Sequence, residues 1–205
     1  MRLPMWVRHC IARVEASKSG YLDQVGWIRT RAECIARDAS GEPIPWFTYP
    51  ALHFLRERVK SEWRILEFGA GMGTLWWSRQ VREAVAIEHD VDWADRVADK
   101  CNARLIRVRA GSADDYLRPA LGSGVYSVVI VDGIFRAECL AIAPSLLDNG
   151  GVIVLDDAQR EEYRFAVEAL CEQGFKLLQL HGPQPVSKHP GCTAIFYRDV
   201  NVLGL

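Results

Sequence analysis

Three glycines at alternate positions follow a short apolar run that contains one acid. The run is "RILEF" at residues 64–68, its acid is Glu67, and the glycines are Gly69, Gly71 and Gly73. Glycine allows a tight turn and lets a ligand approach the backbone closely. A loop of this kind after a strand is typical of sites for nucleotide-like ligands.

Two acids near the loop indicate which ligand it binds. The dinucleotide fingerprint is G-x-G-x-x-G, whereas this loop has Thr74 in place of the third fingerprint glycine. Glu67 would repel a pyrophosphate and attract an ammonium or sulfonium group. Glu88 closes the next apolar run, about 20 residues after Gly69, where a carboxylate can bind both ribose hydroxyls. The pattern predicts S-adenosylmethionine rather than NAD, although Glu88 alone is also compatible with a solvated strand end.

The elements that would position this loop alternate along the chain from residue 64 onward. Runs rich in Val and Ile predict buried parallel strands: "RILEF", "AVAIE", "RLIRV", "YSVVIVD" and "GVIVLDD". Stretches of helical period lie between most of them, at 75–82, 92–101, 136–147 and 161–171. Two final strands, "FKLLQL" and "TAIFYR", are joined by a loop alone, which predicts an antiparallel last pair. We therefore expect a Rossmann-like doubly wound α/β sheet with helices on both faces.

Four motifs in register resemble those of class I S-adenosylmethionine-dependent methyltransferases. They are "EFGAGMGT", "AIEHD", "AGSADDY" and "VDGIFR", and the resemblance covers about residues 45–198. It implies seven strands in the order 3-2-1-4-5-7-6 with the last strand antiparallel. The segment "GEPIPWFTYPALHFL" resembles a subgroup of small bacterial proteins of this type, in which it precedes the sheet and covers the cofactor.

The resemblance also implies a role for individual residues of the cofactor site. Carried over residue by residue, the loop residues would line the methionine part, with Glu67 near its ammonium and Glu88 at the ribose. His89 would lie against the adenine, and Asp132 beneath the sulfonium region. The loop residues are Gly69, Ala70, Gly71 and Gly73, and the residues at the adenine edge are Ala113 and Asp114.

Three further carboxylates follow neighbouring strands of the expected sheet. Asp132 ends the fourth strand, and Asp156 and Asp157 end the fifth. Adjacent strand ends lie about 5 Å apart, and three oxygen donors on one rim suit Mg²⁺. The arrangement resembles metal-dependent O-methyltransferases of the catechol and sugar types, in which the metal lowers the pKa of a substrate hydroxyl. The alternatives are that Asp157 caps a helix beginning near Gln159, and that Asp132 contacts the cofactor or caps Phe135.

Arg136 stands where relatives of the catechol type have a lysine a few residues after the strand-four acid. Arginine stays protonated and is a poor base. We therefore expect Arg136 to orient an anionic or hydroxylated substrate. A pair with Glu138 or Asp157 is the alternative.

The loop "HGPQPVSKHPG" leaves the carboxyl end of the sixth strand and offers candidates for substrate contact or proton transfer. His181 is the first of them, and Lys188, His189 and, on a helix after "TYP", His53 have a similar standing. Each is also compatible with a surface turn. Aromatic residues that would wall a substrate pocket, or belong to the core, are Trp46, Phe47, Tyr49, Trp76 and Trp77.

The chain as a whole is close to neutral and most simply one compact unit. Its 205 residues have a formal net charge of −1, which gives no global reason to expect a nucleic acid or a membrane as partner. We expect residues 1–50 to form an N-terminal helical or loop cap and residues 51–205 the methyltransferase domain, with a homodimer possible. Six scattered cysteines without metal spacing predict free thiols in the cytoplasm.

The function expected from these patterns is methyl transfer from S-adenosylmethionine to a hydroxyl of a small molecule, such as a sugar or secondary metabolite, with Mg²⁺ as a candidate second cofactor. Transfer to nitrogen is an alternative, although no N-P-P-[YFW] tetrapeptide follows the fourth strand. A methyltransferase-like protein that binds the cofactor without catalysis is another. The acceptor itself is not encoded in the fold.

Overall fold

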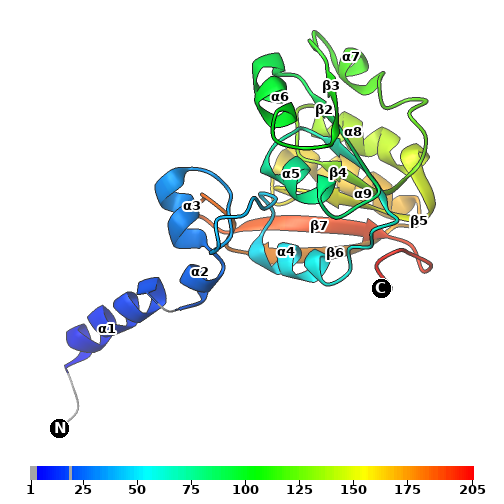
Figure 1. The fold of residues 1–205 in the computed structure, drawn as a ribbon. Helices are drawn as coiled ribbons and strands as arrows, with labels where there is room; N and C mark the ends of the chain where they lie inside the picture. The colour runs from blue at the N-terminus through cyan, green and yellow to red at the C-terminus, as the bar shows by residue number, and fades with distance from the viewer. Residues whose placement is uncertain (1–3, 19) are drawn as a thin grey trace.

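The computed structural model describes residues 4–18 and 20–205 and is built around a seven-stranded sheet (Figure 1). The strand order is β3-β2-β1-β4-β5-β7-β6, as predicted. The first five strands in this order, from β3 to β5, pair in parallel, and β7 runs antiparallel to β5 and β6. The strands are β1 (Arg64–Phe68), β2 (Glu83–Glu88), β3 (Arg104–Arg107), β4 (Tyr126–Val131), β5 (Leu147–Leu155), β6 (Lys176–Gly182) and β7 (Gly191–Tyr197).

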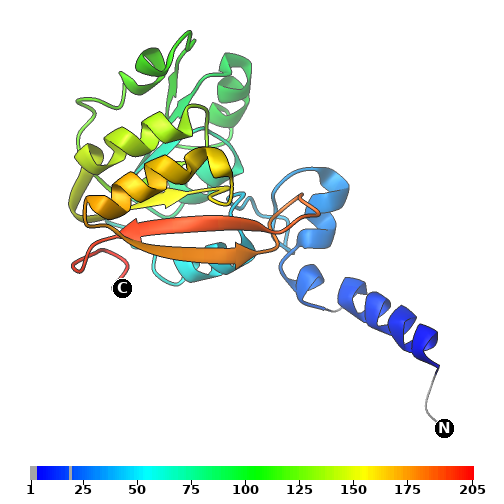
Figure 2. The same ribbon diagram turned by 180° about the vertical axis from the view of Figure 1, so that it is seen from behind.

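Helices cover both faces of this sheet, which confirms the doubly wound fold (Figures 1 and 2). One face packs against α4 (Tyr49–Arg56) and α5 (Met72–Ser78) in the first of two apolar clusters. The other packs against α7 (Ala113–Leu117), α8 (Arg136–Ile142) and α9 (Arg164–Glu172). Contacts of α6 (Val91–Ala98) are with β2, β3 and α5.

The structure differs from the expected elements at the ends of two helices and in one short additional helix. A 3-10 helix, η1 (Ala143–Leu146), continues α8, and another, η2 (Glu161–Tyr163), precedes α9. The segment with α7 carries no clear helical period over its five residues, and we predicted no helix there. β4 is buried at all six positions, because helices cover it on both sides, and this explains its unbroken apolar run.

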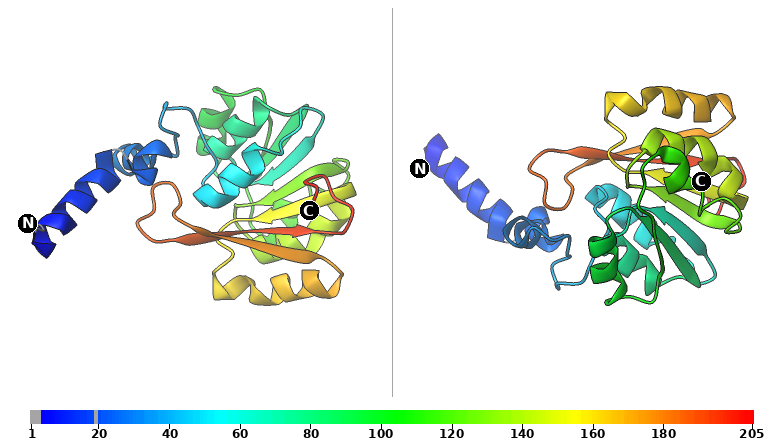
Figure 3. Two further views of the ribbon diagram at one scale, coloured as in Figure 1. Left: turned by 90° about the horizontal axis from the view of Figure 1, so that it is seen from below. Right: turned by 90° about the horizontal axis from the view of Figure 1, so that it is seen from above.

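The N-terminal region combines a projecting part and a buried part. Its helices are α1 (Met5–Lys18), α2 (Tyr21–Gln24) and α3 (Trp27–Glu33), and α1 extends away from the rest of the molecule (Figure 3). Ala36, Ile44 and Phe47 instead pack in the same apolar cluster as β1 and β4. The last part of the expected cap therefore belongs to the core of the sheet.

Among the described residues, no helix combines the length and the apolar character that a membrane span requires. The cysteines Cys10, Cys34, Cys101, Cys139, Cys171 and Cys192 are all free thiols.

Candidate functional site

The glycine loop follows β1 at the edge of the sheet where β1, β2, β4 and β5 end, which we call the carboxyl edge. Three successive amides of the loop already have partners. Gly69 N–H donates to the Ile87 carbonyl (2.8 Å), and Ala70 N–H donates to Glu88 Oε2 (2.8 Å). Gly71 N–H donates to the Thr74 hydroxyl oxygen (3.0 Å). These three amides are thus held by the protein itself.

The first glycine of the loop is needed for a close approach of two backbones. Gly69 has a φ of +95°, and a Cβ atom there would lie 2.9 Å from the backbone of Gly133. A Cβ on Gly133 would in turn lie 2.4 Å from the hydroxyl of Tyr116 and 2.9 Å from Gly69 N. The loop after β1 and the loop after β4 therefore touch, and the touching positions admit only glycine.

The other two loop glycines have different surroundings. A Cβ on Gly71 would have no atom within 4 Å, so this side of the loop is open. A Cβ on Gly73 would lie 2.7 Å from Glu67 Oε1, and Gly73 is buried in the first turn of α5. Gly71 thus has room for a ligand, whereas Gly73 makes room for the Glu67 carboxyl group.

Glu67 is buried (5% exposed) under the start of α5. The Thr74 hydroxyl donates to Glu67 Oε2 in a short hydrogen bond. Burial, opposed by the Thr74 hydrogen bond and assisted by the nearby Asp132 and Glu88 carboxyl groups, raises the pKa of Glu67 to about 8. A cation placed here would relieve this repulsion.

Glu88 gathers donors from both sides of the carboxyl edge. Besides Ala70 N–H, it accepts the backbone N–H groups of His89 (2.8 Å) and Asp90 (2.9 Å) at Oε1. His89 Nδ1 lies 2.7 Å from the same oxygen, and its half-exposed ring meets Tyr116 edge to face at 6.5 Å between centroids. The structure therefore brings the Glu88 carboxyl group and the His89 ring together beside the glycine loop.

Two aromatic residues that the sequence interpretation did not single out hold this region in place. Trp93 Nε1 donates to the Ala70 carbonyl (2.6 Å), so both the N–H group and the carbonyl of Ala70 have protein partners. Tyr116 is fully buried, and its hydroxyl donates to the Ile87 carbonyl (3.0 Å). Tyr116 lies in the motif "AGSADDY", but nothing in its type shows that it reaches the end of β2. Trp93 has no sequence signal beyond its place in an expected helix.

Asp132 and Arg136 form the centre of the second half of the carboxyl edge. Arg136 Nη2 donates to Asp132 Oδ1 (3.0 Å) and to the Asp132 carbonyl (2.9 Å). Its Nη1 donates to the Asp156 carbonyl (2.7 Å) and its Nε to the Gly133 carbonyl (3.0 Å). With these bonds and a side chain only 11% exposed, Arg136 clamps the ends of β4 and β5. Arg136 Nη1 also lies 3.9 Å from Asp157 Oδ2, which is the pair with Asp157 that we considered as the alternative to substrate contact.

Burial raises the pKa of Asp132 to about 6, and Asp157 adds to this effect, whereas the Arg136 charge opposes it. The Asp132 side chain is 28% exposed. Asp132 is therefore a carboxyl group at the open part of the edge that can take up and release a proton near neutral pH.

Asp156 is buried next to β7 and the segment that precedes α4. It is 3% exposed, and the Thr193 hydroxyl donates to its Oδ1 (2.8 Å). Thr48 N–H donates to the Thr193 oxygen (2.9 Å). Burial and the neighbouring Asp132 and Asp157 carboxyl groups raise the pKa of Asp156 well above its usual range.

The predicted magnesium site at Asp132, Asp156 and Asp157 is not formed. Among the residues that the structure describes, no group of three or more acid, histidine or cysteine side chains is arranged to hold a metal ion. Each carboxyl group has a protein donor instead: Arg136 for Asp132, Thr193 for Asp156, and Arg160 for Asp157. The predicted helix caps at Asp157 and Asp132 are also absent, because Asp157 pairs with Arg160 and Asp132 with Arg136.

The likeness of this chain to known proteins lies in its structure rather than in its sequence. No protein-family model matches the sequence, and no curated protein matches it. Solved structures do match. An O-methyltransferase from Bacillus cereus in complex with SAH has a TM-score of 0.61 at 17% identity, over 94% of this chain and 97% of that one. This chain has the class I methyltransferase fold.

Two other methyltransferases show the same likeness. A precorrin-6y C5,15-methyltransferase from Geobacter metallireducens GS-15 has a TM-score of 0.58 at 17% identity, over 73% of this chain and 87% of that one. A methyltransferase from Pyrococcus furiosus has a TM-score of 0.55 at 15% identity, over 93% of this chain and 98% of that one. The resemblance inferred from the four motifs is thus confirmed for the fold.

Other predicted site residues of this methyltransferase fold lie further from the acidic groups. Ala113 and Asp114 begin α7, where the Ser112 side chain caps the helix, and Asp114 is exposed. His181 is exposed on the edge strand β6, where it pairs with Cys192. The preceding residue, Leu180, pairs with Thr193, so the side chain of His181 points to the other face of the sheet from that of Leu180. Lys188 and His189 are exposed in the β6–β7 loop. No described contact joins them to Asp132.

The β6–β7 loop is tied to α3 at the carboxyl edge. Trp27 Nε1 donates to the Ser187 carbonyl (3.0 Å), Arg31 Nη1 to the Val186 carbonyl (2.5 Å), and Val186 N–H to the Thr30 hydroxyl oxygen (3.0 Å). In Figure 3 this loop projects toward α2 and α3. The N-terminal helices and the loop thus form one interlocked flank of the site.

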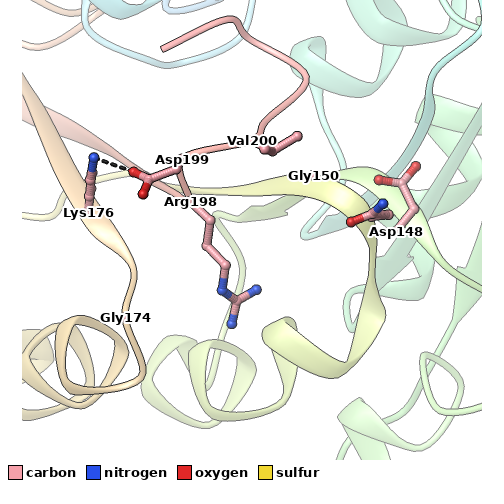
Figure 4. A pocket seen from close by; sticks show the side chains of 8 residues that line it. Asp148, Gly150, Gly174, Lys176, Arg198, Asp199 and Val200 are labelled. Atoms are coloured by element: carbon pink, nitrogen blue, oxygen red, sulfur yellow. Dashed lines mark ion pairs between the residues drawn. The ribbon is translucent and has the colours of Figure 1, made fainter.

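Two cavities lie away from the glycine loop. One of about 440 Å³ lies at the opposite edge of the sheet, beside the Lys176–Asp199 ion pair and the Arg198 side chain (Figure 4). Another of about 570 Å³ lies between α2 and α4 and includes His53, whose Nε2 is 3.4 Å from Glu57. Neither includes the acids at the carboxyl edge.

Proposed function

We propose that this chain is an S-adenosylmethionine-dependent methyltransferase that transfers a methyl group to a hydroxyl of a small molecule. The observation that carries the proposal is the pair of acids, Glu67 and Glu88, on either side of the glycine loop. A phosphate ligand would need free backbone N–H groups and a positive site. The amides of Gly69, Ala70 and Gly71 are instead satisfied, and the nearby charge is negative. This chemistry favours a ligand with a sulfonium and an ammonium group.

The residues at the loop fit such a ligand. The side of Gly71 is open, so the methionine part can lie against its backbone. A bound ammonium or sulfonium group would lower the pKa of Glu67 and stabilise its ionised form, and Asp132 adds a second carboxyl group nearby. Glu88 Oε2 accepts one described hydrogen bond and keeps a lone pair for a ribose hydroxyl, and the half-exposed His89 lies beside it.

Bound S-adenosylmethionine supplies an electrophilic methyl group, and the protein must align an acceptor hydroxyl with it and remove the hydroxyl proton. Asp132 is our candidate for the proton acceptor. Its pKa of about 6 leaves it mostly ionised at neutral pH, and its side chain is partly exposed. Asp156 is buried and Asp157 is paired with Arg160, so neither is equally accessible. Arg136 acts through Asp132, as a residue that positions it.

The proposed partner is a small molecule rather than a nucleic acid or a membrane, because the chain is nearly neutral. A cytoplasmic location and a homodimer remain part of the proposal. Met5 and Trp6 of α1, 72% and 70% exposed, make this helix the candidate contact with a second copy.

Calorimetric titration with S-adenosylhomocysteine tests the cofactor site. We expect micromolar binding by the wild type and a loss of tenfold or more in Glu88→Gln, because a charge-assisted hydrogen bond to ribose is removed. Glu62→Gln, an exposed acid near β1, is the matched control and should bind normally. No binding by a folded wild type would overturn the proposal.

Turnover then separates a methyltransferase from a protein that only binds the cofactor. Folded, cofactor-binding protein should methylate members of a panel of hydroxyl and amine acceptors. Amine methylation alone would replace hydroxyl transfer with transfer to nitrogen. Mg²⁺ or EDTA should leave the Kd for S-adenosylhomocysteine unchanged, because protein donors already occupy the three carboxyl groups that we considered as metal ligands.

A further inference from the structure

One exposed tryptophan interrupts a buried segment before α4. The residues from Pro43 to Tyr49 are all buried except Trp46, whose side chain is 45% exposed. Its neighbours Ile44 and Phe47 are in the apolar core. The segment thus keeps one large aromatic side chain accessible while the residues on both sides of it are packed in the core.

The buried segment crosses the carboxyl edge of the sheet. Pro45 lies 3.6 Å from the place of a Cβ on Gly73, next to Glu67 at the end of β1. Thr48 donates to Thr193, which donates to Asp156 just after β5. The residues between these two contacts pass the end of β4, because β4 lies between β1 and β5. Trp46 is one of these residues, so it lies at the carboxyl edge, on the side of the β4 end.

The charges at this place limit what can bind there. The nearest cations are already paired: Arg136 with Asp132 and three carbonyls, and Arg160 with Asp157. An anionic acceptor would therefore meet the partly exposed Asp132 without a free partner for its own charge. A neutral or cationic ring would meet the Asp132 carboxyl group on one side and an indole face on the other.

We propose that Trp46 forms an aromatic wall of the acceptor site, and that the acceptor carries a planar ring and is neutral or positively charged. This inference rests on the proposed function and names the substrate class of the same site. The ring stacks on the indole, and its hydroxyl lies toward Asp132. Sugars and anionic acceptors are then poor substrates.

Binding of three small rings of equal shape and different charge tests the inference. The probes are catechol, 3,4-dihydroxybenzylamine and 3,4-dihydroxybenzoate, titrated by NMR into protein saturated with S-adenosylhomocysteine. In the wild type we expect the benzoate to bind at least tenfold more weakly than the benzylamine. Trp46→Ala should weaken catechol and the benzylamine about tenfold, because stacking and cation–π contacts are lost. Trp46→Phe should keep their Kd values within about threefold.

Phe165→Ala is the control, because Phe165 is 72% exposed on α9, on the other side of the sheet, and should change no Kd. Wild-type binding of the rings by Trp46→Ala would overturn the inference, as would equal affinity for the benzoate and the benzylamine. Cofactor binding without binding of any ring would overturn the inference alone. Failure to bind S-adenosylhomocysteine would overturn the proposed function first.

Discussion

Both halves of the carboxyl edge have acidic side chains at or just after the ends of strands, but these side chains bind different partners in the two halves. At the ends of β1 and β2, Glu67 and Glu88 bind groups of the glycine loop and of the start of α5: Thr74 is 7 residues from Glu67, and Ala70 is 18 from Glu88. At the end of β5, Asp156 binds Thr193, 37 residues away, and Thr193 binds Thr48, 145 residues away. The first half is built from one stretch of chain, and the second from several.

This difference has a chemical consequence. The acids of the first half order a loop and leave one side of it, at Gly71, open. The acids of the second half are bound to arginine and threonine side chains, and Asp132 is partly exposed among them. The first half is thus prepared for a ligand of fixed shape, and the second for proton transfer to or from a variable acceptor.

The largest expected effect comes from the glycines of the first half. Gly69→Ala should lower the free energy of unfolding by about 3 kcal/mol or more, because it combines a φ of +95° with a contact of 2.9 Å to the Gly133 backbone. Urea unfolding followed by circular dichroism measures the loss.

Gly71→Ala is the matched comparison within the same loop. Its φ is −178°, and its Cβ would meet no atom, so stability should change by less than about 1 kcal/mol. The affinity for S-adenosylhomocysteine should nevertheless fall, because the methyl group fills the open side. Equal loss of stability in the two variants would contradict the assignment of different roles to these glycines.

In the second half, Arg136→Gln should lower the free energy of unfolding by about 3 kcal/mol. It removes the cation beside Asp132 and leaves the carbonyls of Asp132, Gly133 and Asp156 without their donor. Denaturant unfolding measures this.

Arg118→Gln is the control, since Arg118 is 74% exposed and pairs with Asp115 only at the surface (3.2 Å). That pair should contribute less than about 1 kcal/mol. If Arg136→Gln were as mild as Arg118→Gln, the ends of β4 and β5 would not depend on the clamp.

The same comparison explains how far the sequence could be interpreted. The alternation of strands and helices and the reversed last strand were predictable from the apolar period and from the loop that joins the last two strands. The strand order followed from the resemblance that the four motifs carry. The prediction of a metal site was wrong because Asp156 and Asp157 bind protein side chains instead. Those side chains, Thr193 and Arg160, could be identified only from the folded structure. Trp93 was missed for the same reason, since its bond joins α6 to the loop after β1.

A different kind of effect is the pH dependence that Glu67 contributes, which builds up gradually over several pH units. Its pKa is about 8 in the folded protein and about 4.5 when exposed, so the folded state keeps a proton that the unfolded state has lost in between. This contribution to stability is complete below about pH 4.5 and is lost as the pH rises through 8, at up to about 1.4 kcal/mol per pH unit.

Glu67→Gln should remove that slope, because its amide oxygen still accepts the Thr74 hydroxyl and has no proton to lose. The measured quantity is the difference in free energy of unfolding between variant and wild type, from pH 5 to 8. It should shift steadily in favour of the variant as the pH rises. Glu62→Gln, at an exposed acid, should give a flat difference. A flat difference for Glu67→Gln as well would mean that Glu67 is ionised throughout.

The smallest effect that we predict concerns the indole bond that fixes the Ala70 peptide. Trp93→Phe removes the hydrogen bond from Nε1 to the Ala70 carbonyl and keeps the aromatic bulk. We expect the Kd for S-adenosylhomocysteine to rise about fivefold, since a net hydrogen bond contributes about 1 kcal/mol.

Trp27→Phe is matched to it, because Trp27 makes an equivalent bond from Nε1 to the Ser187 carbonyl in the other half of the edge. It should leave the Kd for S-adenosylhomocysteine unchanged. The two variants lose the same kind of bond, so a difference between them reports where the bond lies rather than its loss as such. Equal Kd values would show that the loop keeps its shape through Glu88 alone, and that the first half does not need its second anchor.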